Sequence, residues 1–273
     1  MNDKLKKKVE QAIRLLQSIK GDQLELSYSG GKDSDVILEL AKMAGIKYRA
    51  IYKNTTIDPP GTIKHVREKG VEVVQPKETF AELIRKKGFP SRYRRFCCSE
   101  LKEYPILNKS IQGIRRSESK KREKRYMEPS ACRDYGNRGR VEIWFPILEW
   151  TDEDIKEFVD LYRVKCHPLY YDEKGVFHPE RRLGCMCCPL ASRKKRIKEF
   201  MKYPRMVKFY ISNGDKYLEN HRESKTSKRF ESVYEWFCAG LFTDNMDEFN
   251  MKFKGLFPVD CKVFLENMFD LKL

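Results

Sequence analysis

The sequence predicts an α/β protein with a Rossmann-like parallel sheet flanked by helices and a helical C-terminal subdomain. Two observations predict this fold class. Short apolar segments with strand-like alternation are separated by segments of helical periodicity through residue 150, an order typical of parallel sheets. Beyond Ser192 the apolar spacing is helical, apart from a break at Tyr203-Pro204. We therefore expect a sheet domain over residues 1–191 and a helical subdomain over residues 192–273.

The individual elements follow from periodicity and from start and stop signals. Apolar residues of Asp3 to Lys20 share one helical face, and Pro59-Pro60-Gly61 is a helix start. Thr151, with Asp154 three residues later, forms a variant capping box. The expected elements of the sheet domain are helix 3–20, strand 23–28, a helix from residue 35, strand 47–53, a helix ending at Gly70, strand 71–74, helix 79–87, a strand ending before Arg115, strand 141–148 and a helix after Thr151.

A glycine-rich loop joins the first strand to the next helix. Its residues are Ser29, Gly30, Gly31, Lys32, Asp33 and Ser34. Two adjacent glycines let the backbone turn and present its N–H groups, and the following helix adds its positive end. Lys32 adds an ammonium group, and Asp33 can hold Mg²⁺ or cap the helix. These features predict an oligophosphate site, although an ordinary turn with a helix cap is the alternative.

The positive charge is local. The formal net charge is +16, and residues 115–125 carry seven basic against two acidic residues, residues 181–202 eight against one, and residues 92–95 three arginines. An anionic partner is therefore expected. Arg115, Arg116 and Arg122 follow a predicted strand, and their fork geometry suits phosphate or sulfate oxygens.

Nine cysteines are too many and too clustered to be incidental. Cys97 and Cys98 are adjacent, and Cys185 and Cys188 have the spacing at which one turn directs two thiolates to one metal centre. Buried apolar thiols are the alternative. Because Cys187 lies between Cys185 and Cys188, the sequence leaves open which of these cysteines are the ligands. Cys166 could replace one of the tandem pair, as could His167 or His178 if the metal were zinc.

The start of the chain lacks the apolar core of a signal peptide, and no apolar run approaches the ~20 residues that span a membrane. We expect a cytoplasmic protein with no membrane partner. In a reducing compartment, grouped cysteines favour metal binding or catalysis over disulfides.

Four motifs in order resemble the family of PP-loop ATP pyrophosphatases and phosphoadenosine phosphosulfate (PAPS) reductases, in the adenine nucleotide α hydrolase-like superfamily. They are the loop Ser-Gly-Gly-Lys-Asp-Ser, the Cys97-Cys98 segment, the run from Gly113 to Arg122 that fits Gly-x-Arg-x-x-Glu-Ser-x-x-Arg, and Cys185-x-x-Cys188. The resemblance implies that residues 1–191 form a nucleotide-binding domain. It implies ATP with Mg²⁺ on the loop, and adenosine at the end of the second strand, at Asn54 and Thr55, where a simple turn is the alternative. Some members hold a [4Fe–4S] cluster on such cysteines, which makes Cys97, Cys98, Cys185 and Cys188 the expected ligands, with zinc as the alternative.

Two departures select among family members. The Glu-Cys-Gly-x-His segment of assimilatory reductases is missing, since the sequence ends in Asp270-Leu271-Lys272-Leu273, and the loop is intact as in members that cleave ATP. We therefore expect an AMP-forming ATP pyrophosphatase that activates an acceptor, DNA or tRNA, for sulfur transfer, with a sulfur-donor protein as partner. Lys32, Asp33, Arg115 and Arg116 are the expected catalytic residues. The alternatives are PAPS reduction with a partner thiol and a nucleotide-binding or nucleic-acid-binding module without turnover.

Overall fold

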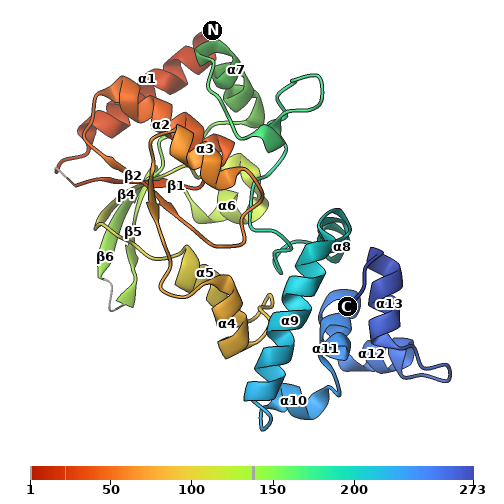
Figure 1. The fold of residues 1–273 in the computed structure, drawn as a ribbon. Coiled ribbons are helices and arrows are strands. Elements are labelled where there is room, and N and C mark those ends of the chain that lie inside the picture. The colour runs from red at the N-terminus through yellow and green to blue at the C-terminus, as the bar shows by residue number, and fades with distance from the viewer. Residues whose placement is uncertain (1, 22, 137–138) are drawn as a thin grey trace. The chain divides into compact units, whose positions relative to one another are not determined.

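The computed structural model describes residues 2–21, 23–136 and 139–273 (Figure 1). Packing divides the chain into two units. The sheet unit comprises Met1–Asn54, Asp58–Pro76 and Leu101–Gly184. The helical unit comprises Thr55–Ile57, Lys77–Glu100 and Cys185–Leu273. The domain boundary expected at residue 191 stays a prediction, and residues 77–100 pack with the C-terminal helices.

Within the described residues, six strands form one sheet in the order β3-β2-β1-β4-β6-β5. The four pairings among the first five strands of that order are parallel, so the predicted parallel α/β fold is confirmed. Strand β5 pairs antiparallel with β6 at one edge and was not predicted, because its residues are mostly polar and lack apolar alternation. The strands are β1 (Glu25–Tyr28), β2 (Arg49–Lys53), β3 (Glu72–Val74), β4 (Lys109–Gln112), β5 (Ser130–Asp134) and β6 (Arg140–Trp144).

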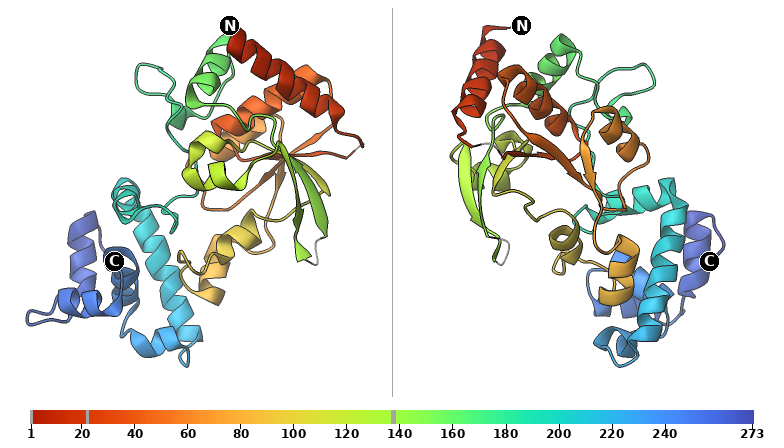
Figure 2. Two further views of the ribbon diagram at one scale, coloured as in Figure 1. Left: turned by 180° about the vertical axis from the view of Figure 1, so that it is seen from behind. Right: turned by 60° about the vertical axis from the view of Figure 1, so that its left-hand side comes forward.

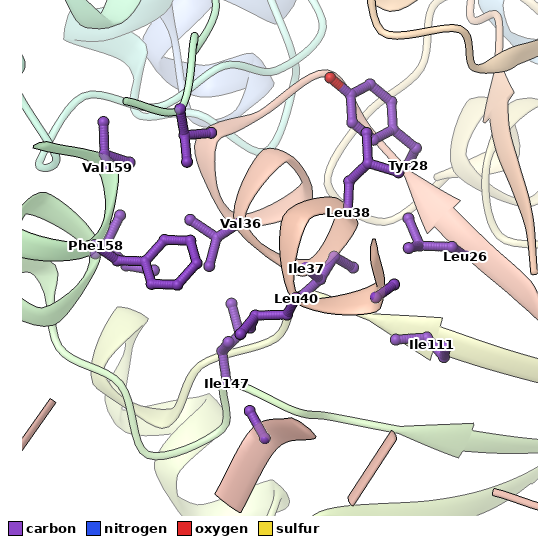
Figure 3. Packing of buried hydrophobic residues seen from close by; sticks show 14 of the residues in the cluster. Leu26, Tyr28, Val36, Ile37, Leu38, Leu40, Ile111, Ile147, Phe158 and Val159 are labelled. Atoms are coloured by element: carbon purple, nitrogen blue, oxygen red, sulfur yellow. The ribbon is translucent and has the colours of Figure 1, made fainter. Parts of the chain in front are cut away.

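The core of the sheet unit lies between the strands and the apolar faces of its helices, chiefly α1, α2 and α7. Val36, Ile37 and Leu40 lie on α2 between the strand residues Leu26 and Ile111 on one side and helix α7 on the other (Figure 3). All five are fully buried, which stabilises the unit by roughly 1.5–3 kcal/mol per side chain. The helices of this unit are α1 (Asp3–Ser18), α2 (Lys32–Ala44), α3 (Thr62–Glu68), α6 (Lys120–Arg125) and α7 (Asp152–Tyr162), with short 3₁₀ turns η1 (Arg116–Glu118) and η3 (Pro168–Tyr170).

The strand order places a topological switch point between β1 and β4. The chain runs from β1 outward through β2 and β3, and then crosses to β4 on the other side of β1. In open α/β sheets, ligands bind beyond the carboxyl ends of the strands at such a point. The glycine loop after β1 and the arginines after β4 both lie at this end of the sheet.

The helical unit is held together by aromatic side chains. Phe200 and Phe237 are almost fully buried, and their rings contact each other and Tyr210 edge-on. Phe89 stacks on Trp236 with a centroid separation of 4.0 Å, which fixes residues 77–100 to this core. The helices are α4 (Phe80–Lys87), α5 (Phe96–Leu101), α8 (Arg193–Lys202), α9 (Pro204–Asn220), α10 (Lys225–Arg229), α11 (Val233–Phe242), α12 (Met246–Phe253) and α13 (Cys261–Phe269), two further views of which appear in Figure 2.

Every helix in the described part of the chain is too short or too polar to cross a lipid bilayer.

Candidate functional site

The glycine loop makes a tight turn that only glycine allows at its second position. Gly30 has φ +76°, and a Cβ there would lie 3.2 Å from the side chain of Thr62 and 3.4 Å from that of Leu183. The Ser34 hydroxyl donates to the Gly31 carbonyl at 2.6 Å. The loop is therefore fixed from both sides before any ligand binds.

Helix α2 begins at this loop without a side-chain cap. Its N-cap is Gly31, which has no side chain to accept from the first-turn N–H groups. By contrast, α4 and α7 have complete capping boxes at Thr79 and Thr151. The Lys32 N–H is directed to the Tyr170 hydroxyl. The other first-turn N–H groups and the positive end of the helix dipole favour an anion at this position.

A polar cavity of about 240 Å³ opens at the N-terminus of α2. Its volume is at the small end of ligand pockets and suits the phosphate portion of a nucleotide better than the whole molecule. The cavity is lined by Ser27, Ser29, Gly31, Lys32, Asp33, Ser34, Gly113, Glu118, Arg122, Tyr170, Arg182 and Leu183.

Lys32 is the loop's buried cation. It is only 3% exposed, and its Nζ lies 3.1 Å from Asp33 Oδ2 and 5.5 Å from the centroid of the Tyr170 ring. Burial raises the pKa of Tyr170 to about 12, so its hydroxyl stays neutral, and it accepts a hydrogen bond from the Leu183 N–H at 3.2 Å. These contacts hold the ammonium group at the cavity wall.

Arg115 clamps the segment after β4 onto the loop. It is 2% exposed, and its Nε donates to Asp33 Oδ1 at 2.7 Å while its Nη2 donates to Asp152 at 2.7 Å. Its Nη1 donates to the Ser117 hydroxyl at 3.1 Å. With every guanidinium nitrogen engaged, Arg115 acts on the cavity through Asp33.

The other two predicted arginines lie apart from each other. Arg116 Nη1 donates to Glu149 at 2.9 Å, which raises the pKa of Arg116, and Arg116 lines a different cavity of about 400 Å³. Arg122 lines the loop cavity and pairs with Glu118, and burial lowers its pKa. Of the two, only Arg122 lies where it can contact an anion at the loop.

Sequence reasoning missed Arg182 as a site residue. It lines the same cavity as Arg122, and its Nη2 donates to the Glu118 carbonyl at 2.6 Å. Arg182 belongs to the basic run of residues 181–202, but nothing local in that run indicates contact with a loop 150 residues earlier.

Asn54 and Thr55 do not line the loop cavity. Asn54 Nδ2 donates to Gln75 Oε1 at 2.8 Å, which holds it beside the end of β3. Thr55 belongs to the helical unit, is 1% exposed, and its Oγ1 lies 3.8 Å from Cys185 Sγ. Their assignment to the adenosine edge stays a prediction.

The four predicted cysteine ligands all belong to the helical unit. Cys97 and Cys98 lie on α5, and Cys185 and Cys188 lie in the segment before α8. A hydrogen bond with Cys98, burial, and the nearby thiols of Cys98, Cys185 and Cys188 raise the pKa of Cys97. Two segments nearly 90 residues apart in sequence therefore bring these thiols into one neighbourhood.

Cys187 differs from the cysteines on either side of it. It is fully buried, its backbone has φ +54°, and its N–H donates to Glu199 Oε2 at 2.8 Å. Burial and the Glu199 carboxylate raise the pKa of Cys187 to about 12. Cys185 and Cys188 are partly exposed. These two thiols are therefore accessible to a ligand, whereas that of Cys187 is not.

The alternative ligands lie in the sheet unit. Cys166 is buried, and burial followed by the Asp35 carboxylate raises its pKa. His167 Nδ1 accepts from the Leu169 N–H at 3.1 Å, and burial lowers the pKa of His167. His178 contacts Asp172 and Glu180.

A cluster would have to draw the thiols together. Among the residues that the structure describes, no three His, Cys, Asp or Glu side chains are arranged to hold a metal ion. Arg196 supplies an independent observation that fits a cluster. Its Nε is buried with no hydrogen-bond partner in the described chain, and it lies near Cys187 and Cys188. A buried donor without an acceptor beside neighbouring thiols fits an anionic group there.

A model of the phosphoadenosine phosphosulfate reductase domain family matches residues 23–191. An uncharacterized protein of Methanocaldococcus jannaschii is 32% identical over 228 residues, which cover 77% of this chain and 52% of the relative. An uncharacterized 37.8 kDa protein of Escherichia phage 186 is 30% identical over 154 residues, 51% of this chain and 43% of the relative. The chain thus spans about half the length of the curated relatives it matches.

Two solved structures are also similar. The U34-tRNA thiolase NcsA of Methanococcus maripaludis, solved with its [4Fe–4S] cluster, has a TM-score of 0.42 and 14% identity over 80% of both chains. The NH₃-dependent NAD synthetase of Campylobacter jejuni, in complex with nitrate, has a TM-score of 0.36 and 12% identity over 82% of this chain and 97% of that one. At these scores neither comparison bears on what this chain does.

Proposed function

The chain belongs to the phosphoadenosine phosphosulfate reductase domain family, and on that premise we propose that it is an AMP-forming ATP pyrophosphatase that activates an acceptor for sulfur transfer. The observation that carries the proposal is the uncapped start of α2, which opens into a polar cavity lined by Lys32, Arg122 and Arg182. Main-chain N–H groups and three cations are the chemistry that a pyrophosphate group needs.

The reaction breaks ATP between its α- and β-phosphates. An acceptor oxygen attacks the α-phosphorus and pyrophosphate leaves. Sulfide from a donor protein then displaces AMP from the adenylated acceptor. Lys32, Arg122 and the first N–H groups of α2 stabilise the negative charge that develops on the leaving pyrophosphate. Mg²⁺ arrives with ATP as part of the substrate.

Asp33 and Arg115 position the loop in this scheme. Their 2.7 Å ion pair joins the phosphate-binding turn to the segment after β4, so both approach the nucleotide as one piece. Arg116, which pairs with Glu149 beside another cavity, has no direct part in the proposed step.

The thiols of Cys97, Cys98, Cys185 and Cys188 would hold a [4Fe–4S] cluster, with zinc as the alternative. Four thiols lie in one neighbourhood, and the buried Nε of Arg196 has no hydrogen-bond partner among the described residues. Both observations support a net-negative thiolate-bound group. When bound, a cluster would bind or deliver sulfide or an electron. The acceptor is DNA or tRNA, whose charge complements the basic segments of the chain.

The test is the product of ATP turnover by anaerobically purified protein supplied with Mg²⁺, sulfide and either tRNA or DNA. We expect AMP and pyrophosphate in equal amounts. Lys32→Ala should abolish their release, whereas Lys42→Ala, which removes an exposed lysine from the same helix, should not. ADP with phosphate would contradict the proposal. Sulfite release from phosphoadenylyl sulfate with a thiol partner would indicate a reductase, and ATP binding without consumption a non-catalytic module.

A further inference from the structure

A basic segment adjoins each of the two cysteine motifs. Arg92, Tyr93, Arg94 and Arg95 precede Cys97, and the basic helix α8 begins at Arg193, shortly after Cys188. Both segments belong to the helical unit, and Arg92 Nη2 donates to the Ala191 carbonyl at 3.3 Å. The two basic segments are therefore adjacent in space as well as next to the thiols.

Helix α8 presents a stripe of lysines to solvent. Lys194, Lys198 and Lys202 recur at i, i+4 and i+8 and are all exposed, so they extend over about 12 Å of one helix face. Lys194 and Lys198 form no ion pair within the described residues. Lysines that form no ion pair with the described carboxylates are available to bind a row of phosphates.

Tyr93 is the second, independent observation. Its side chain is 98% exposed, although its neighbours are anchored. Arg94 Nη2 donates to the Lys87 carbonyl at 2.7 Å, and the N–H groups of Tyr93 and Arg94 donate to the Ser91 hydroxyl at 3.3 and 3.1 Å. The loop is thus held in place while it presents an aromatic ring to solvent between two arginines.

We propose that the loop 92–95 and the lysine stripe of α8 bind a single-stranded segment of nucleic acid. One base stacks on the Tyr93 ring, and the phosphates lie along Lys194 and Lys198. An exposed aromatic ring in an arginine-rich loop, close to the start of a helix with exposed lysines, is an arrangement that binds unpaired bases, whereas paired bases offer no free face to stack on. This inference rests on the proposed function, in which the bound strand is the acceptor and has to reach the thiols.

Fluorescence anisotropy with labelled single-stranded RNA and DNA oligonucleotides, and with the matching duplexes, tests the proposal. We expect the single strands to bind more tightly than the duplexes. Tyr93→Ala should weaken binding about tenfold, and Tyr93→Phe, which keeps the ring, should not. The double variant Lys194→Gln, Lys198→Gln should reduce the slope of log affinity against log salt by about one to two.

A matched control is available at the far end of the same unit. Lys225 and Lys228 are exposed lysines of α10, which lies at the opposite end of α9 from α8 (Figure 1). Lys225→Gln with Lys228→Gln should leave both affinity and salt slope unchanged. Equal binding of duplex and single strand, wild-type affinity of Tyr93→Ala, or equally tight binding of polyglutamate would overturn the proposal.

The same proteins separate this inference from the proposed function. Lys32→Ala should bind the oligonucleotide normally even though it releases no AMP. Normal strand binding by a wild-type protein that never cleaves ATP would contradict the proposed function alone. Release of AMP and pyrophosphate by a protein that fails to bind single strands would contradict this inference alone.

Discussion

Asp33 and Arg115, 82 positions apart in sequence, are joined by an ion pair of 2.7 Å between Oδ1 and Nε. Beside this pair, the backbone at Gly113 also packs closely against the backbone at Asp33. A Cβ at Gly113 would lie 3.0 Å from the main-chain carbonyl of Asp33. The loop after β1 and the segment after β4 therefore form one structure across the switch point of the sheet, and changes at either should affect the other.

Gly113→Ala should impair the loop without unfolding the protein. The added methyl group meets backbone atoms, which can yield only if the loop shifts, and such overpacking costs about 1–3 kcal/mol. A shift of this kind can lower turnover about 100-fold. AMP release measures it. The control is Gly240→Ala, where a Cβ meets nothing within 4 Å and a helix interior favours alanine. Equal AMP release by the two variants would contradict the close-approach argument.

Arg115→Ala should lower both stability and turnover. Because the guanidinium is 2% exposed, its removal leaves the mostly buried Asp33 carboxylate without its partner, at a cost of about 3 kcal/mol, while the exposed Asp152 adds little. Arg115→Lys keeps the charge but reaches fewer acceptors, so its loss should be intermediate. Urea unfolding measures the free energy of unfolding. Arg49→Ala, at an exposed pair with Glu72, is the control and should cost less than about 1 kcal/mol. Similar losses at positions 115 and 49 would refute the clamp.

The elements that could be predicted from the sequence have local signals. The loop between β1 and α2 follows from its own six residues, and the capping residues Thr79 and Thr151 mark the starts of α4 and α7. Arg182 and Tyr170 could not be placed at the loop, because they reach it through long-range packing after α7. Strand β5 has no apolar alternation that would distinguish it from a loop.

The packing of residues 77–100 with the C-terminal helices could not be predicted from the sequence either. It depends on how Phe89 fits against Trp236 and over Gly214, where an added Cβ would clash with the Phe89 ring. A single sequence does not reveal which aromatic residues meet at such separations. Likewise, the spacing of Cys185, Cys187 and Cys188 allows several ligand pairs, and only the complete burial of Cys187 distinguishes it.

Asp154 should make stability depend on acid pH. Burial alone would raise its pKa, but hydrogen bonds from Lys8 at 2.5 Å and from the Thr151 N–H outweigh burial and hold the pKa below its ordinary value. A depressed pKa contributes stability above the unfolded-state value of about 4, and the contribution is lost as pH falls through the folded-state value. Asp154→Asn should therefore cost about 1 kcal/mol at pH 7 and almost nothing near pH 2. Urea unfolding at both pH values measures this, and a pH-independent loss would show that the charge is irrelevant.

Serine at Cys97, Cys185 or Cys188 should lower the iron content of anaerobically purified protein. Each change removes one of the neighbouring thiols, and a [4Fe–4S] cluster normally needs four. Cys132→Ser changes an exposed cysteine of β5 and is the control. It should change neither the iron content nor the absorbance near about 400 nm that iron–thiolate charge transfer gives. Cys187→Ala should retain the cluster while costing about 1 kcal/mol of stability. Loss of iron at Cys187 but not at Cys188 would exchange their assigned roles, and zinc in place of iron would select the alternative metal.

Arg196→Met should affect the protein in opposite directions with and without the metal centre. Without it, the buried Nε lacks an acceptor among the described residues, and the hydrogen bond from Nη1 to the Gly240 carbonyl is exposed, so losing it costs little. Removal of the side chain should therefore raise the free energy of unfolding by about 1 kcal/mol. With it, the same change removes a cation beside Cys188 and should speed the loss of metal to a chelator. Arg193→Met, on the same helix but paired at the surface with Asp244, should alter neither quantity appreciably. If Arg196→Met slowed metal loss, or destabilised the metal-free protein, Arg196 would be a structural residue of α8 and not a partner of the thiol-bound group.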